Sequence, residues 1–141
     1  MKRDRQRSAV YSWEDKTIAP HDTTAVPFDQ IEFIVNHVWA KEGLEHPPQV
    51  IPIAKTAKGA DATRIKVRFG KTTFTWIILH ELAHSMTTQH DGPSNKHGAL
   101  FLGLYCQLVS RHLNFDFDLL AKSAEEWGLR IKRDAKPVWL E

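Results

Sequence analysis

The sequence predicts an α+β domain with about four helices and a small sheet. Apolar residues recur at spacings of three and four along much of the chain, as in helices, and one segment alternates apolar with basic residues, as a half-buried strand does. The chain has 141 residues, of which 42% are hydrophobic, and this size and composition fit one compact domain. We expect a single domain over residues 1–141, with residues 1–26 as a loosely packed N-terminal arm that Val10, Tyr11 and Trp13 anchor.

The first helix is expected to begin at Phe28. Its apolar stripe consists of Phe28, Ile31, Ile34, Val35, Val38 and Trp39. Gly43 fits the end of this helix, and the pair Pro47 and Pro48 forbids its continuation.

Two strands are expected next. Val50–Ile53 is typical of a short strand, with Pro52 at a sheet edge or at the strand's end. Thr63–Phe69 alternates between two sets of side chains. The set expected to face the core is Ile65, Val67 and Phe69, and the set expected to form a basic outer face is Arg64, Lys66 and Arg68.

Three further helices complete the predicted fold. Thr72 or Thr73 can cap a helix that runs to about Thr88, and Asn95 can cap the next one. The apolar stripe of that next helix is Leu100, Phe101, Leu104, Leu108 and Val109. Asp116 can cap a last helix through Trp127, with Gly128 directly after it, and residues 129–133 are expected to form a final strand.

Composition excludes several classes of protein. Lys and Arg number 19 against 17 Asp and Glu, and the resulting net charge of +2 is too small for a dedicated polyanion binder. The single cysteine, Cys106, excludes an intrachain disulfide and a cysteine-based zinc cluster. The basic N-terminus is followed by no apolar stretch, and no apolar run is long enough to span a bilayer. We therefore expect a cytoplasmic protein without a membrane partner.

The segment from His80 to His84 is an H-E-x-x-H sequence inside a predicted helix. Residues four apart lie one turn above each other, so both imidazoles can reach one metal ion, and Glu81 can take a proton from water without ligating the metal. Such short patterns also occur by chance. Here, however, the surrounding helix is apolar and therefore buried, where two histidines and a glutamate without a metal would be hard to satisfy. We interpret the motif as a metal site with Glu81 as the general base.

A catalytic zinc site usually has three protein ligands, so a third ligand is expected elsewhere. We favour His97, because it follows a Gly-Pro loop that can reverse the chain and it opens the next helix. His90 has the spacing of the metzincin pattern, but Thr87 stands where that pattern requires a glycine to break the helix. A downstream carboxylate, Glu125 or Glu126, is the remaining alternative.

The HELAH sequence followed by His97-Gly98-Ala99-Leu100-Phe101 resembles the HExxH…HGxxF arrangement of SprT-like (Spartan-type) zincin domains. The whole chain is more similar still to a family of small metallohydrolases encoded by actinobacteria and their phages, which share these motifs and the opening Arg3-Asp4-Arg5-Gln6-Arg7 with Val10-Tyr11. The resemblance implies a minimal zincin-like fold with the HExxH motif on a central helix. It also implies a Zn²⁺ ion held by His80, His84 and His97, and a peptidase-like activity with Glu81 as the base.

We therefore expect a zinc-dependent metallohydrolase that hydrolyses peptide bonds in a protein or peptide substrate. One alternative is a nucleic-acid-associated binding module with a structural or vestigial zinc site, since the basic strand face could make a weak DNA contact. Another is a hydrolase of non-peptide amides or esters. In zincins a strand beside the active-site helix commonly binds the substrate backbone, which suits the strand Thr63–Phe69 if it lies at a sheet edge.

Several other residues have a functional and a structural interpretation. Tyr105 could reach the site as an oxyanion donor, but we favour a core tyrosine. Asp91 could orient a ligand imidazole, but we favour an ordinary turn residue. Cys106 is expected to be a small core residue. The histidines expected to be structural or on the surface are His21, His37, His46 and His112.

Overall fold

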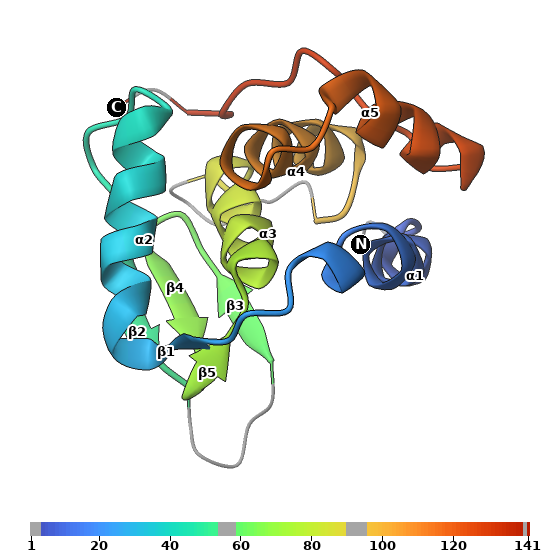
Figure 1. Cartoon of the computed structure of the whole chain (residues 1–141). Coiled ribbons are helices and arrows are strands. Elements are labelled where there is room, and N and C mark those ends of the chain that lie inside the picture. Colours follow the sequence, from blue (N-terminus) through green and yellow to red (C-terminus); the bar gives the residue numbers. More distant parts are fainter. Residues whose placement is uncertain (1–3, 54–58, 90–95, 140) are drawn as a thin grey trace.

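The computed structural model describes residues 4–53, 59–89, 96–139 and 141 (Figure 1). Among them the fold is mixed α+β, as predicted. The elements are α1 (Arg7–Thr17), a short 3₁₀ helix η1 (Ala19–His21), β1 (Val26–Pro27), α2 (Phe28–Lys41), β2 (Gln49–Pro52), β3 (Ala60–Ala62), β4 (Lys66–Phe69), β5 (Thr72–Thr73), α3 (Thr75–Met86), α4 (Ala99–Leu113) and α5 (Phe117–Glu126). No helix in these described ranges is long and apolar enough to cross a membrane.

The strands form two small sheets. In the larger sheet β4 lies between β2, to which it is parallel, and β3, to which it is antiparallel. The second sheet consists of β1 and β5, which pair antiparallel. Pro52 is the last residue of β2, which is an edge strand, as the sequence predicts. Proline has no N–H group to donate, and it is tolerated both in an edge strand and at the end of a strand because no ladder hydrogen bond is lost there.

Helix α3 occupies the middle of the molecule (Figure 1). It packs against α4 on one side and against β3 and β4 on the other, and α2 also contacts it. Most of its residues from Ile78 to Met86 are consequently buried. The HELAH sequence therefore lies on a central helix, and its polar side chains are held inside the protein.

The amphipathic helices follow their sequence patterns closely. The buried residues of α2 are Ile31, Val35, Val38 and Trp39, all members of the predicted stripe. Asp116 caps α5, since its carboxylate accepts a hydrogen bond from the backbone N–H of Leu119 at 2.9 Å. Gly128 has a φ of +79°, the left-handed conformation that ends this helix and favours glycine.

Helix α1 lies within the segment that we expected to be a loosely packed arm, and it adds a helix to the predicted number. Val10 and Trp13 are fully buried. The indole N–H of Trp13 donates to the hydroxyl of Ser123 on α5 at 3.0 Å, while Tyr11 stays 41% exposed. Two of the three expected anchors therefore hold α1 against the body of the protein.

The predicted strand Thr63–Phe69 is wrong in its first half. Residues 63–65 form the turn between β3 and β4, in which the backbone N–H of Thr63 donates to the carbonyl of Lys66 at 2.7 Å. The turn reverses the expected orientations, so that Arg64 is only 4% exposed and Ile65 is 57% exposed. The alternation holds for β4 itself, where Val67 and Phe69 are buried.

Arg64 belongs to a buried group of charged and aromatic side chains, the Arg64 cluster, which consists of Arg64, Trp39, Trp139 and Glu141. The guanidinium lies 3.9 Å from the ring centre of Trp139 and 5.2 Å from that of Trp39. It also donates to the carbonyl of His46 and forms an ion pair with Glu141 at 3.6 Å. This cluster ties the C-terminal segment to the turn before β4.

Three more predictions need correction: the final strand, the start of α3 and the cap of α4. The expected final strand, residues 129–133, instead lies along α4, where the N–H of Lys132 donates to the carbonyl of Ala99 at 3.0 Å. Gly103 permits this approach, since a Cβ at that position would lie 1.8 Å from the carbonyl oxygen of Lys132. Helix α3 begins at Thr75 because Thr72–Thr73 form β5, and Phe74 occupies the N-cap position.

The expected cap of α4 is also replaced. Gly98 precedes the first helical residue, Ala99, so His97 lies in the loop before this helix and does not open it. Asn95, which we expected to cap the helix, lies outside the described residues.

Candidate metal centre

Three histidines converge on one point between α3 and the loop that precedes α4. His80 and His84 are four residues apart on α3, and His97 approaches them from that loop. The Nε2 atom of His84 lies 3.2 Å from the Nε2 atoms of both His80 and His97, and these two lie 3.4 Å apart. The structure therefore brings together the three residues that the sequence analysis favoured as metal ligands.

These spacings fit a metal ion bound by three nitrogens. Zn–N bonds of about 2.0–2.1 Å in a tetrahedron place the nitrogens roughly 3.3–3.4 Å apart. The three Nε2 atoms thus form nearly one face of such a tetrahedron, and the group could hold a metal ion. Nitrogen ligands from neutral imidazoles suit Zn²⁺ and neighbouring transition metals better than Mg²⁺ or Ca²⁺.

Two of the three histidines contact a carboxylate through Nδ1, the ring nitrogen that does not face the other histidines. The Nδ1 atom of His80 lies 2.7 Å from Oε2 of Glu14, and Nδ1 of His97 lies 2.7 Å from Oδ2 of Asp4. The same Oε2 atom of Glu14 accepts a hydrogen bond from the hydroxyl of Tyr105 at 2.6 Å. Because a carboxylate can only accept, each contact places the imidazole proton on Nδ1 and leaves the Nε2 lone pair facing the centre.

The sequence analysis missed both Asp4 and Glu14. Each lies in a polar segment without a long apolar stripe, where acidic residues ordinarily face water. Their partners are 93 and 66 residues away in the chain, so no local spacing could reveal the contacts. The one available signal was the pair of buried anchors, Val10 and Trp13, which fix the helix that carries Glu14.

Aromatic rings enclose the three imidazoles. The ring of Phe101 stacks on His84 with ring centres 4.3 Å apart and meets His80 and His97 at 4.9 and 5.1 Å. The ring of Tyr11, which is partly exposed, lies 6.1 Å from His80 and 5.2 Å from His97. Phe101 is fully buried, so the centre has a closed floor and an open side next to Tyr11.

Burial sets the protonation of the polar groups. Burial raises the pKa of Glu81 from 4.5 to about 7, although the nearby His80 partly opposes the shift. Burial also holds the pKa of His84 well below its ordinary value, and the neighbouring histidines lower it further. Burial lowers the pKa of His80, but the hydrogen bond and charge of Glu14 outweigh it and raise that pKa overall.

A cleft leads to the open side of the centre. It comprises two adjoining cavities of about 320 and 400 Å³, and Tyr11, Ala60, His80 and Glu81 line both of them. The smaller cavity extends along the apolar side chains of Trp76 and Ile77. The larger one extends past polar residues, which include Arg7, Asp61, Lys96 and the remaining two histidines. Strand β3 therefore borders the cleft directly beside Glu81.

The alternative third ligands can now be placed. Glu125 and Glu126 are exposed on α5, where Glu125 pairs with Arg133 and not with the histidines. His90 lies outside the described residues, as does Asp91, the residue that could have oriented an imidazole.

The other residues for which the sequence offered a functional or a structural interpretation do not belong to the group of three histidines. Tyr105 is fully buried and donates to Glu14, in agreement with the core interpretation. Cys106 is buried in α4, and burial raises the pKa of its thiol. His21, His37 and His46 are exposed, and His112 pairs with Glu42 at 3.1 Å.

The basic strand face is smaller than the sequence suggested. Arg64 is buried in the Arg64 cluster, and Arg68 forms an ion pair with Asp61 on the neighbouring strand. Of the three predicted basic residues on this face, Arg64 is therefore absent from the surface and the charge of Arg68 is compensated. This arrangement weakens the case for a surface that follows phosphates.

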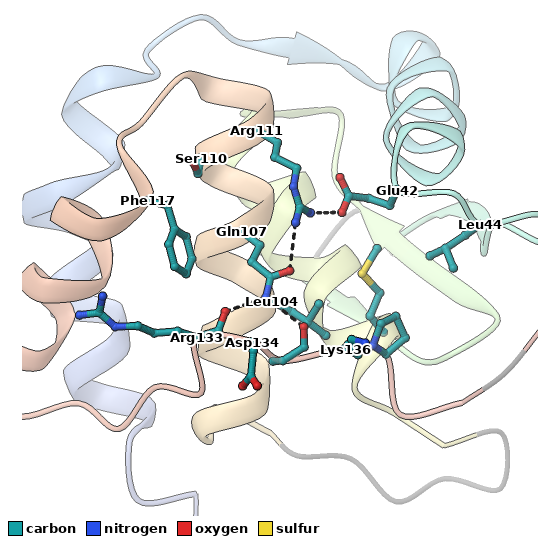
Figure 2. Close-up of a pocket in the computed structure, with 13 residues that line it drawn as sticks. Glu42, Leu44, Leu104, Gln107, Ser110, Arg111, Phe117, Arg133, Asp134 and Lys136 are labelled. Carbon is teal, nitrogen blue, oxygen red and sulfur yellow. Dashed lines mark hydrogen bonds and ion pairs between the residues drawn. The ribbon is translucent and has the colours of Figure 1, made fainter.

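A larger cavity, of about 560 Å³, lies away from the histidines (Figure 2). Its walls come from α4, the start of α5 and residues 133–137, and none of its lining residues also lines the cleft. Figure 2 shows Arg111 paired with Glu42 and bonded to Gln107, whose amide in turn donates to backbone carbonyls. These polar groups satisfy one another within the protein.

Comparisons with protein families, with curated proteins and with solved structures found no match for this chain.

Proposed function

We propose that this protein is a zinc-dependent hydrolase that cleaves peptide bonds at the His80, His84 and His97 centre. The observation that carries the proposal is the set of three Nε2 atoms, 3.2–3.4 Å apart, at the spacing of a tetrahedral zinc site. An acidic group beside them, Glu81, lines the cleft and supplies the base that such a hydrolase needs.

A bound Zn²⁺ ion supplies a Lewis acid that polarises a carbonyl and lowers the pKa of water. Glu81 accepts the proton of the attacking water and later gives it to the leaving amine, so that one water adds across the broken C–N bond. In the metal-free protein burial raises the pKa of Glu81 to about 7, and an upward shift suits a carboxyl group that both accepts and returns a proton. Glu14 and Asp4 keep the lone pairs of His80 and His97 directed toward the centre.

The position of β3 supports a peptide substrate. We expected the strand Thr63–Phe69 to receive a substrate backbone if it lay at a sheet edge, but β4 lies inside the sheet, and β3 is the edge strand on the side of the cleft. Strand β3 borders the cleft through Ala60, Asp61 and Ala62, next to Glu81. An extended peptide that pairs with this edge would pass over the three histidines.

The proposal is tested by metal analysis and by one conservative substitution. Protein purified without an affinity tag or added metal is expected to contain about one zinc per chain and to cleave casein or a peptide library. Glu81→Gln keeps the shape of the side chain but removes the base, so zinc content is expected to persist while cleavage falls by at least about 100-fold. Chelation followed by zinc addition should abolish and restore the wild-type activity.

Three outcomes would overturn parts of this proposal. Protein that contains no zinc, and takes up none at micromolar concentration, would reject the metal centre. Undiminished cleavage by Glu81→Gln would reject the role of Glu81. Zinc-dependent cleavage of esters or non-peptide amides, with casein and the peptide library intact, would retain the hydrolase and reject the peptidase.

A further inference from the structure

We infer that the N-terminal segment from Asp4 to Glu14 is a functional part of the metal centre, in which Asp4 and Glu14 are positioning residues for the ligands. This inference rests on the proposed function, because it assigns these carboxylates a role in metal affinity. It goes beyond that function in making α1, which supplies no metal ligand, a determinant of metal binding.

The hydrogen bonds from the two carboxylates select one tautomer of each imidazole. Neutral imidazole has two tautomers, and only one of them leaves Nε2 free to bind a metal. Contacts of 2.7 Å from Nδ1 to Glu14 and to Asp4 select that tautomer in His80 and in His97. Without them, each ring would divide between the two tautomers and rotate more freely, and metal binding would have to restore order at a cost in affinity.

The N-terminal segment also connects two separate elements that carry the candidate ligands. His80 lies on α3 and His97 lies 17 residues later, in the loop before α4. The N-terminal segment holds both, through Glu14 at one end and Asp4 at the other. Gln6, between them, donates from its side chain to the backbone carbonyl of His97 at 2.8 Å. The segment therefore fixes the distance between the ligands as well as their orientation.

The burial and the charge of Glu14 also support a role beside a cation. Glu14 is only 1% exposed, although burying a carboxylate is costly unless its charge is compensated. Among the described residues its carboxylate contacts Nδ1 of His80 and accepts a hydrogen bond from the neutral hydroxyl of Tyr105. Three neutral imidazoles and a divalent cation would carry a charge of +2, which the carboxylates of Asp4 and Glu14 would balance. A buried acid placed solely for packing has no need of this arrangement.

The experiment measures zinc affinity by competition with a chelator of known affinity. Asp4→Asn and Glu14→Gln keep the size of each side chain and remove its charge, and each is expected to weaken zinc binding by about 10–100-fold. Asp29→Asn and Glu32→Gln make the same chemical changes at exposed positions of α2, and are expected to leave the affinity unchanged.

A second measurement separates positioning from general stability. Long-range ¹H–¹⁵N spectra of the metal-free protein report which ring nitrogen of each histidine carries the proton. Wild-type His97 is expected to be protonated on Nδ1, and Asp4→Asn is expected to shift it to a mixture of tautomers. The side chain of Asp4 is 20% exposed, so this variant should fold even if Glu14→Gln does not, and its circular dichroism spectrum will verify that.

The outcomes distinguish this inference from the proposed function. Wild-type protein that binds no zinc would reject the proposed function. Wild-type protein that binds zinc, with a folded Asp4→Asn variant of equal affinity and an unchanged His97 tautomer, would overturn the inference and leave the proposed function intact. Weaker zinc binding together with a mixed tautomer would support it.

Discussion

The candidate metal centre and the Arg64 cluster are two buried polar groups in which charge is compensated differently. In the Arg64 cluster the guanidinium meets an ion-pair partner, a backbone carbonyl and two indole faces, all from the chain itself. In the metal centre three imidazole nitrogens face one another, and carboxylates stand behind two of them. The first group contains its own cation, whereas the second has the geometry and the negative charge to receive one. The buried Nε atom of Arg64 has no hydrogen-bond partner among the described residues, so complete matching of donors with acceptors does not distinguish the two groups. The presence of a cation from the chain itself separates a structural cluster from a candidate site more clearly than burial does.

The largest expected effect comes from removing a ligand. His84→Ala leaves two of the three imidazoles, and we expect zinc affinity to fall by at least about 10,000-fold, which is more than 5 kcal/mol. His37→Ala removes an exposed histidine of α2 and serves as the control. Chelator competition measures both variants, and an affinity for His84→Ala within tenfold of wild type would show that zinc binds elsewhere.

The Arg64 cluster should affect stability without affecting metal binding. Arg64→Ala leaves Glu141 without its ion-pair partner and opens a space beside the stacked rings of Trp39 and Trp139, so we expect the free energy of unfolding to fall by about 3–4 kcal/mol. Arg68→Ala breaks the half-exposed ion pair with Asp61 and should cost less than about 1 kcal/mol.

Urea unfolding of the metal-free variants measures these costs, and chelator competition measures zinc affinity on the same samples. We expect Arg64→Ala to bind zinc within about threefold of wild type, since its cluster shares no residue with the centre. If zinc affinity fell in parallel with stability, the two buried groups would be coupled and the contrast between them would fail.

The sequence predicts the parts of the two groups that depend on local spacing. The i, i+4 spacing of His80 and His84 on an apolar helix is sufficient to place both imidazoles on one side. Loop reversal and helix packing made His97 the favoured third residue, and the structure brings it to the same point. The stripe of α2 and the cap of α5 are likewise properties of single helices, and both are confirmed.

The parts that the sequence missed depend on contacts between distant segments. Arg64 and Ile65 exchange their predicted environments because a turn interrupts the alternation, and a period of two identifies faces only within a continuous strand. Asp4 and Glu14 resemble ordinary solvated acids until α1 docks beside the histidines. Residues 129–133 lie along α4 at Gly103, where the N–H of Lys132 donates to the carbonyl of Ala99 and not to a neighbouring strand.

A smaller effect should appear in the pH dependence of the stability of the metal-free protein. The pKa values of Glu81, beside the candidate metal centre, and of Glu141, in the Arg64 cluster, shift in opposite directions. The pKa of Glu81 is raised by burial to about 7, whereas that of Glu141 is lowered: burial opposes this shift, but N–H donors from Glu45, His46 and Trp39 outweigh it. Folded protein therefore keeps the Glu81 proton at pH values where the unfolded chain, with a pKa of about 4.5, has lost it.

Because the folded state binds more protons in that window, the Glu81 contribution to stability is present below pH 4.5 and is lost as the pH rises toward 7. Glu81→Gln does not titrate, so we expect its stability relative to wild type to rise by about 2–3 kcal/mol between pH 4.5 and 7. For Glu141→Gln we expect the opposite pH dependence: its loss of stability relative to wild type should be full at pH 7 and should disappear as the pH falls through the acidic range of a carboxyl group.

Urea unfolding in the presence of a chelator, at half-unit steps from pH 3 to 8, measures both differences. Parallel curves for the two variants would mean that the carboxyl groups of Glu81 and Glu141 occupy electrostatically similar sites, contrary to the comparison drawn from their contacts.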